Sequence, residues 1–320
     1  HYGIGATLAR RIPAAEMLVV TSPSSFSLAA ARMGWPLQDV TTLSLHGRPI
    51  ELVLPHLHPG RKILALTSDE TEPARISGLL TGAGFGRSAV TVLDALGGPH
   101  EKVRTTLAQS FDIENISPLN VLAIDILADE NARIVPLTPG LPDDWFGHDG
   151  QITKREIRAL TLSALAPRRG EMLWDIGAGS GSVGIEWMLS DPSLSAIAIE
   201  ADPVRGSRIV DNAALMGVPG LTIRVGRAPQ VLEKLEQPDA IFIGGGGTED
   251  GVVDAAIAAL KPGGRLVANA VTLEMEALLA LLHQQMGGSL TRIQIARAEP
   301  LGTMSGWRPA MPVTQWVWVK

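Results

Sequence analysis

The sequence predicts an α/β protein of two domains, the second a Rossmann-like, doubly wound methyltransferase-type sheet that ends in an antiparallel hairpin. The chain has 320 residues, and at roughly 150 residues per domain this length favours two units. Short aliphatic runs alternate with helical patterns, which is typical of βαβ units. Prolines and glycines crowd residues 135–150, so we expect a linker there between domains at 1–134 and 151–320.

The first half is predicted to be a parallel α/β domain. We expect strands at residues 17–21, 62–66, 90–93 and 121–127, and helices at 25–33, 72–80 and 101–110. Because helical patterns separate these strands, we expect them to pair in parallel. The chain starts at His1 and has no strand before Tyr2-Gly3-Ile4-Gly5. We therefore expect the natural N-terminal part of this domain to be missing.

The second half begins with Thr153 and Glu156 at capping-box spacing, which predicts a helix to about residue 165. Strands are expected at 171–176, 196–200, 221–225, 240–243 and 265–270, and helices at 183–189, 204–216, 251–260 and 273–286. Two further β-runs, 291–298 and 313–319, have no helix between them. They predict the terminal antiparallel pair.

Composition limits the function classes. The chain has no cysteine, no apolar run of ~20 residues and no secretory leader pattern, so we expect a cytoplasmic protein outside the membrane. The net charge of −6 argues against a nucleic-acid-binding protein, which needs clustered basic residues. His56 and His58 lack further metal-type neighbours, so we expect no metal site. A small or medium-sized ligand is the favoured partner.

A glycine-rich turn is the first candidate site. The segment Asp175-Ile176-Gly177-Ala178-Gly179-Ser180-Gly181 leads from a predicted strand into a helix, and glycine lets the backbone approach a ligand closely. Glu200 ends the next predicted strand, where its carboxylate could accept hydrogen bonds from both ribose hydroxyls of a nucleoside. These features favour S-adenosylmethionine, as do the turn at 261–264 and the terminal hairpin.

Two alternatives to this cofactor stay open. Gly179, Gly181 and Gly184 also satisfy the dinucleotide fingerprint, which would make the protein a nicotinamide-dependent oxidoreductase. The glycines could also serve tight turns alone. With S-adenosylmethionine as cofactor, a methyltransferase of another substrate also stays open.

A second candidate site follows the predicted strand 240–243, because open α/β sheets bind ligands at the carboxyl ends of their strands. Four successive glycines stand there: Gly244, Gly245, Gly246 and Gly247. A bulky flat substrate could lie against this bare backbone, although a flexible loop explains the glycines equally well. Trp307 lies in the predicted loop between the last two strands and is a candidate substrate contact. Most other tryptophans are expected in the core.

These residues carry a resemblance to known families. The second half resembles the decarboxylating precorrin methyltransferases of cobalamin biosynthesis through residues 150–158, the turn 175–181, Gly226-Arg227-Ala228-Pro229 and the four glycines. The first half resembles the tetrapyrrole methylases through residues 2–5, 24–35 and 44–49. In this order the halves resemble the precorrin-6Y C(5,15)-methyltransferase (decarboxylating) family.

The resemblance implies an activity for each half. The family converts precorrin-6Y to precorrin-8X, and the second half would methylate carbon 15 and remove carbon dioxide from the carbon 12 acetate. The first half would methylate carbon 5 when complete. Here it begins after the strand and glycine-rich loop that open the tetrapyrrole methylase fold, so a non-catalytic role for it stays open. No pyridoxal or metal is implied, because the conjugated macrocycle can accept the electrons of the decarboxylation.

The resemblance also implies site residues. The expected S-adenosylmethionine site comprises Thr153, Gly177, Ala178, Gly179, Ser180, Gly181, Glu200 and Ala228. Arg227 stands where the family usually has an acidic residue, so the adenine contact would rest on the backbone of Ala228. The expected substrate contacts are Gly244, Gly245, Gly246, Gly247, Arg297, Trp307 and Arg308. Lys154, Arg155 and Arg158 are further candidates for the substrate carboxylates, although ordinary solvated charge explains any one of them equally well. We expect a homo-oligomer.

Overall fold

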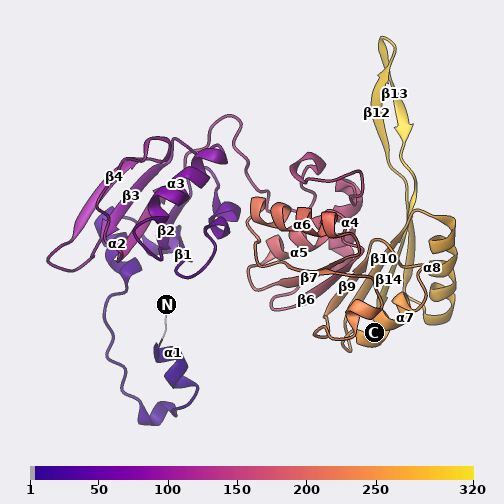
Figure 1. Ribbon diagram of the computed structural model, residues 1–320, viewed down its shortest axis with the longest axis horizontal. Coiled ribbons are helices and arrows are strands. Elements are labelled where there is room, and N and C mark those ends of the chain that lie inside the picture. The colour runs from indigo at the N-terminus through magenta and orange to yellow at the C-terminus, as the bar shows by residue number, and fades with distance from the viewer. Residues whose placement is uncertain (1–3) are drawn as a thin grey trace. The chain divides into compact units, whose positions relative to one another are not determined.

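The computed structural model describes residues 4–320, and the chain divides into two compact units, one ending at Ile134 and the other running Val135–Lys320. Figure 1 labels their helices and strands. Tyr2 and Gly3, part of the first motif of the tetrapyrrole methylase resemblance, lie outside the described residues. No helix within residues 4–320 is long and apolar enough to cross a membrane.

The first unit contains a five-stranded sheet with the order β1-β2-β5-β3-β4. The strands are β1 (Val40–Ser44), β2 (Lys62–Leu66), β3 (Ala89–Asp94), β4 (Lys102–Leu107) and β5 (Asn120–Asp125), and the helices are α1 (Ile4–Ala9), α2 (Ser25–Met33) and α3 (Glu72–Gly82). One core cluster includes Phe26 and Ala29 of α2, and a second includes Ile76 and Leu80 of α3. The helices α2 and α3 therefore bury separate apolar clusters of this unit.

Three expectations for the first unit are wrong. The sheet is mainly antiparallel, since β1 and β2 alone pair in parallel. Residues 101–110, expected as a helix, contain β4, because Val103, Thr105 and Thr106 are β-branched residues that favour extended backbone. Residues 17–21 form no strand, and Leu18 and Val20 are exposed. A strand needs a pairing partner as well as apolar residues.

The second unit contains a seven-stranded sheet with the order β11-β14-β10-β9-β6-β7-β8. Its strands are β6 (Met172–Ile176), β7 (Ser195–Glu200), β8 (Thr222–Val225), β9 (Ala240–Ile243), β10 (Arg265–Ala270), β11 (Ser289–Ile293) and β14 (Val313–Val319). The strands from β6 to β10 are parallel, and β14 pairs antiparallel with both β10 and β11. The chain runs outward from β6 to β8 and returns at β9, so β6 and β9 form the switch point where such sheets bind ligands.

Helices cover both faces of this sheet. The helices α4 (Arg155–Leu165), α5 (Ser182–Ser190) and α6 (Pro203–Leu215) contribute to one core. The helices α7 (Val252–Ala259) and α8 (Leu273–Met286) contribute to the other. The N-cap side chains of Asp202 and Thr272 accept backbone hydrogen bonds at the start of α6 and α8. The capping box expected at Thr153 is wrong: Lys154 is the N-cap of α4, with no side-chain cap hydrogen bond, so Glu156 is not at the required third position.

The C-terminal part contains a hairpin that the sequence did not predict. The expected antiparallel pairing of the last β-runs is confirmed for β11 and β14. Residues 291–298 are nevertheless divided, because β12 (Ala296–Leu301) and β13 (Met304–Pro309) form a separate two-stranded sheet. This hairpin extends away from the seven-stranded sheet (Figure 1). Its residues are exposed on both faces, so its sequence lacks the apolar alternation by which a half-buried strand is recognised.

Residues 135–150 differ from the expected linker. Apart from a short 3₁₀ turn at Asp143–Trp145 they have no helix or strand, as the prolines and glycines predict. Yet Val135, Leu141 and Phe146 are buried in the core of the second unit. Prolines and glycines prevent a regular helix or strand in this segment. They do not prevent its burial where the backbone finds hydrogen-bond partners.

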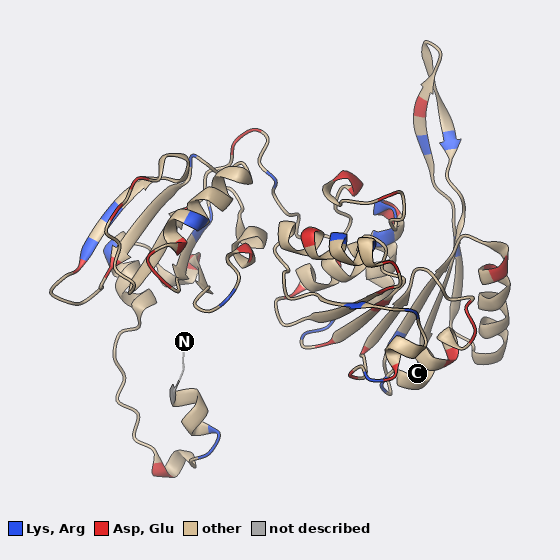
Figure 2. Cartoon of the chain, viewed as in Figure 1, with Lys and Arg blue, Asp and Glu red and all other residues tan. Residues whose placement is uncertain are grey.

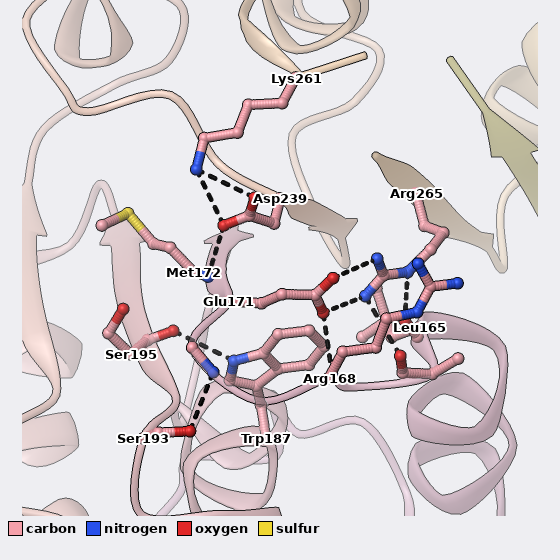
Figure 3. A network of polar contacts seen from close by, with 12 residues as sticks. Leu165, Arg168, Glu171, Met172, Trp187, Ser193, Ser195, Asp239, Lys261 and Arg265 are labelled. Atoms are coloured by element: carbon pink, nitrogen blue, oxygen red, sulfur yellow. Dashed lines mark hydrogen bonds and ion pairs between the residues drawn. The ribbon is translucent and has the colours of Figure 1, made fainter. Parts of the chain in front are cut away.

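A polar network ties together the amino ends of the parallel strands (Figure 3). Arg265, at the start of β10, donates to the carbonyl of Leu165 and forms an ion pair with Glu171 at 2.5 Å. Asp239, before β9, accepts from the Met172 amide and pairs with Lys261, both at 2.9 Å. Elsewhere acidic and basic residues are interspersed along both units (Figure 2). Because the network occupies the amino edge, the opposite, carboxyl edge of the sheet stays available to a ligand.

Candidate functional site

A cavity of about 730 Å³ opens at the carboxyl edge of the second sheet. The ends of β6, β7, β9 and β10 contribute to its wall, and so do the segment before α4 and the base of the β12–β13 hairpin. Among its lining residues are Gly150, Gln151, Ile152, Lys154, Ile157, Ala201, Arg205, Gly226, Arg227, Glu249, Asn269, Val271, Ile293, Ile295, Ala310, Met311 and Val313. Its position matches the switch point between β6 and β9.

The glycine-rich turn requires glycine for two reasons. Gly177, Gly179 and Gly181 all have positive φ, between 59° and 74°, a region that side-chain-bearing residues rarely adopt. A Cβ atom at Gly177 would also lie 2.5 Å from the carbonyl oxygen of Gly245. The turn and the four-glycine loop are thus in backbone contact, and both line the cavity.

Glu200 holds the turn in place. Glu200 is 6% exposed as a residue, and its carboxylate accepts hydrogen bonds from the amide of Gly179 at 2.8 Å and the amide of Asp202 at 3.0 Å. A carboxylate has about four acceptor sites, so two remain for a ligand in the cavity, which Glu200 lines.

Asp175, near the end of β6, binds the first turn of α5 and does not line the cavity. Its Oδ2 atom accepts from the amide of Gly184 at 2.9 Å, whereas its Oδ1 atom is buried without a partner. Burial raises the pKa of Asp175 to about 7, and the nearby charge of Glu200 adds to this rise. Its carboxyl group can therefore gain or lose a proton near neutral pH.

Most of the expected S-adenosylmethionine-binding residues line the cavity: Thr153, Gly177, Ala178, Gly179, Glu200 and Ala228. Ser180 and Gly181 lie outside it. The carbonyl of Ser180 accepts from Asn212 at 2.9 Å, and a Cβ atom at Gly181 would lie 2.6 Å from Ile209. These two residues shape the turn and its packing on α6.

The expected substrate residues are divided. Gly244, Gly245, Gly246 and Arg297 line the cavity, and Arg297 forms an ion pair with Glu156 of α4. Gly247 instead packs against Met275. Trp307 is 77% exposed and lies in β13 rather than in a loop, and Arg308 of the same strand pairs with Glu299 at 3.2 Å. Neither hairpin residue lines the cavity.

The other basic candidates differ in their surroundings. Lys154 lines the cavity, whereas Arg155 is exposed and does not. Arg158 is fully buried and pairs with Glu186 at 2.5 Å, so it is not available to a substrate carboxylate. A basic residue in a helix looks the same in sequence whether solvent or an ion pair surrounds it.

Sequence reasoning missed several lining residues, including Asn269, Glu249 and Arg205. The side chain of Arg205 pairs with Asp149 at 2.9 Å, and this hydrogen-bonded guanidinium lowers the pKa of Asp149 to about 2. Asn269 was detectable, because a polar residue inside an apolar strand requires a partner. Within residues 4–320, no group of three or more histidine or acidic residues gathers as a metal site would require.

Comparison with known proteins identifies the family. A family model described as a precorrin methyltransferase domain matches residues 144–320. A precorrin-6Y C(5,15)-methyltransferase [decarboxylating] from a Sinorhizobium species is 62% identical over 319 residues, which cover 100% of this chain and 77% of that protein. The chain belongs to the precorrin-6Y C(5,15)-methyltransferase family. The resemblance seen in the motifs is thereby confirmed.

Two further relatives match about half of this chain. The crystal structure of the C-terminal domain of the Rhodobacter capsulatus precorrin-6Y C5,15-methyltransferase is 51% identical, with a TM-score of 0.55, and covers 58% of this chain and 100% of its own. A cobalt-precorrin-6B C(15)-methyltransferase (decarboxylating) from Salmonella typhi is 36% identical over 181 residues, or 54% of this chain and 92% of that protein. Domains of this kind therefore occur alone as well as in fusions.

Proposed function

We propose that the second unit uses S-adenosylmethionine to methylate carbon 15 of a precorrin and removes carbon dioxide from the acetate on carbon 12. Methylation of carbon 5 is assigned to the first unit. The observation that carries the proposal is the cavity at the switch point, where the glycine turn, Glu200 and the four-glycine loop meet. The Salmonella relative, which matches 54% of this chain over 92% of its own length, bears a C(15) decarboxylating name, which supports the division of labour.

The methyl donor is assigned to the part of the cavity lined by the turn, Glu200 and Ala228. Glu200 has two acceptor sites left for ribose hydroxyls, and the backbone around Ala228 is available to adenine. When bound, S-adenosylmethionine supplies a methyl group on a positively charged sulfur. The protein's part is to hold the two reactants in line and exclude water, so no nucleophilic side chain is required.

The macrocycle is assigned to the other part of the cavity. Gly244, Gly245 and Gly246 are exposed there, so a flat ring can approach their backbone without meeting a side chain. The macrocycle carries several carboxylates, and Arg297 and Lys154 are the lining cations suited to bind them. Glu156 keeps the guanidinium of Arg297 engaged until a substrate carboxylate replaces it.

Product mass tests the proposal directly. The full chain would be incubated with the precorrin substrate and S-adenosylmethionine that carries an isotopically labelled methyl group. We expect a product that has gained the label and lost carbon dioxide. A macrocycle of unchanged mass would overturn the proposal. Titration with S-adenosylhomocysteine and NAD separates this function from the nicotinamide-dependent alternative, and we expect binding of the first compound alone.

A further inference from the structure

Asn269 is a polar residue in an otherwise apolar strand, and it lines the cavity. Its neighbours along β10, Val267, Ala268 and Ala270, are buried hydrophobic residues. Asn269 is half-buried, and it lies on the face of the sheet that α4 covers. A polar side chain at such a position destabilises the fold unless it is hydrogen-bonded.

Two buried side chains fix the orientation of the Asn269 amide. Its Nδ2 atom donates to Thr161 Oγ1 at 2.9 Å, and its Oδ1 atom accepts from Gln315 Nε2 at 2.9 Å. Gln315 also donates to Thr161 Oγ1 at 3.2 Å. Thr161 is 0% exposed and Gln315 is 5% exposed. With Gln315 in this orientation, a reversed Asn269 amide would face it donor to donor, so the second N–H of Asn269 is the one left for the cavity.

The surroundings of Asn269 are apolar. Val271 follows it on β10, and Val313 and Ile293 lie at the same edge on β14 and β11, where they pair with each other. Gln315, the strand partner of Asn269, belongs to the same hydrogen-bonded group. The cations of the cavity wall, Lys154, Arg205, Arg227 and Arg297, come from segments other than these three strands. A single uncharged N–H donor on an apolar wall suits one carboxylate.

We propose that Asn269 binds a ligand carboxylate through this N–H, and that the carboxylate belongs to the acetate that the enzyme removes. This inference rests on the proposed function. In the reaction the bond between the acetate methylene and its carboxyl carbon breaks, and its electron pair passes into the conjugated macrocycle. Carbon dioxide leaves, and the methylene takes a proton from solvent to become a methyl group.

An uncharged anchor fits this reaction better than an arginine does. The negative charge lies on the carboxylate before the reaction and on the macrocycle in the transition state. A cation at the carboxylate would stabilise the ground state more than the transition state and so slow the step. A neutral amide orients the acetate but stabilises its negative charge less than an arginine would. The apolar wall keeps water away from the acetate.

The experiment compares carbon dioxide release and S-adenosylhomocysteine affinity in the full-length wild type and in Asn269→Asp. This substitution keeps the size of the side chain but presents a carboxylate to the acetate. We expect carbon dioxide release to fall at least about tenfold, in keeping with the loss of one charge-assisted hydrogen bond. The dissociation constant for S-adenosylhomocysteine should stay within about twofold of wild type.

Two Thr→Val substitutions provide a matched pair. Thr161→Val removes the hydroxyl that orients Asn269, so carbon dioxide release should fall. Thr314→Val removes a buried hydroxyl that has no partner and lies outside the cavity wall, so release should not change.

Three results would overturn the inference about Asn269. Carbon dioxide release could stay at the wild-type rate in Asn269→Asp. In Asn269→Asp, the affinity for S-adenosylhomocysteine could fall together with carbon dioxide release, which would mean that Asn269 binds the carboxylate of the methyl donor. The two Thr→Val variants could behave alike. If wild type itself releases no carbon dioxide, the proposed function fails instead, and the two failures are distinguishable.

Discussion

Asp175 illustrates how a single buried residue makes the stability of the fold depend on pH. Its pKa is raised from 3.8 to about 7, mainly by burial. Because the folded value lies above the unfolded one, its favourable contribution is complete below about pH 4 and is lost as the pH rises through about 7. Ionisation of Asp175 therefore destabilises the folded state at alkaline pH.

Replacing Asp175 by Asn should remove this pH dependence while keeping an oxygen for the Gly184 amide. Between about pH 4 and pH 8 the free energy of unfolding of Asp175→Asn should improve relative to wild type by up to about 4 kcal/mol. Urea denaturation of both proteins at a series of pH values measures the difference. A difference that stays constant across this range would contradict the prediction.

Glu200 gives a second prediction at this scale. Glu200→Ala removes the carboxylate that holds the Gly179 amide and faces the cavity. S-adenosylhomocysteine binding should weaken by about 1.5 to 3 kcal/mol for each charge-assisted hydrogen bond to the ribose that is lost. Isothermal calorimetry measures the affinity, and Glu299→Ala, on the exposed hairpin, is the control. Equal affinity in wild type and Glu200→Ala would remove Glu200 from the site.

The predicted site residues that line the cavity are those whose positions follow from local sequence. The glycines at 177 and 179 follow directly from a strand that turns into a helix, and Glu200 follows from the end of the next strand. Asn269 and Arg158 behave differently, because their roles depend on Gln315 and Glu186, far away in sequence. Patterns of neighbouring residues in a single sequence do not reveal pairs that are distant along the chain.

At the scale of elements, a buried ion pair fastens the cavity rim. Arg158 of α4 pairs with Glu186 of α5 and donates to the carbonyl of Thr153 at 2.5 Å. Glu186 in turn accepts from the amides of Gly140 and Leu141. Residues 140–153 are thus attached to two helices, and the last part of this segment lines the cavity.

Arg158→Ala should therefore destabilise the second unit strongly. Removal of one partner of a buried pair leaves an unpaired charge, with a typical cost of about 3 to 5 kcal/mol. Chemical denaturation of the full chain measures the loss. Arg308→Ala, which breaks the exposed pair with Glu299, is the matched control and should change stability by less than about 1 kcal/mol. Equal effects of the two substitutions would show that the buried pair does not fasten the rim.

Elements with strong apolar patterns were predictable, and elements without them were not. The strands β9 and β10 have the predicted bounds because they are almost entirely buried. The helices α2 and α8 have them because a Ser or Thr N-cap and a C-cap glycine mark their ends. β4 was mistaken for a helix, and the β12–β13 hairpin was missed, because exposed strands carry no such pattern. The direction of strand pairing in the first unit was also mispredicted, since it depends on long-range topology.

At the scale of the whole molecule, the homo-oligomer stays a prediction. The hairpin exposes Leu301, Met304 and Trp307, each at least 68% accessible, and an isolated two-stranded hairpin is at best marginally stable in water. A second copy of the chain would cover these residues. We expect light scattering to give a mass above that of one chain, and a triple substitution of these residues by Ser to reduce it. A monomeric wild type would refute this expectation.

Gly177 and Gly245 approach closely, so the turn that we assign to the methyl donor and the loop that we assign to the macrocycle are expected not to bind independently. A single methyl group at position 177 would collide with the Gly245 backbone, so Gly177→Ala should displace the turn and the loop together. We expect it to weaken S-adenosylhomocysteine binding and to raise the KM for the macrocycle, whereas Gly78→Ala in α3, where φ is not positive and a Cβ atom meets nothing within 4 Å, should change neither. If binding of one ligand changes the affinity for the second by some factor, then binding of the second changes the affinity for the first by the same factor. We therefore expect the affinity for one reactant to depend on whether the other is bound.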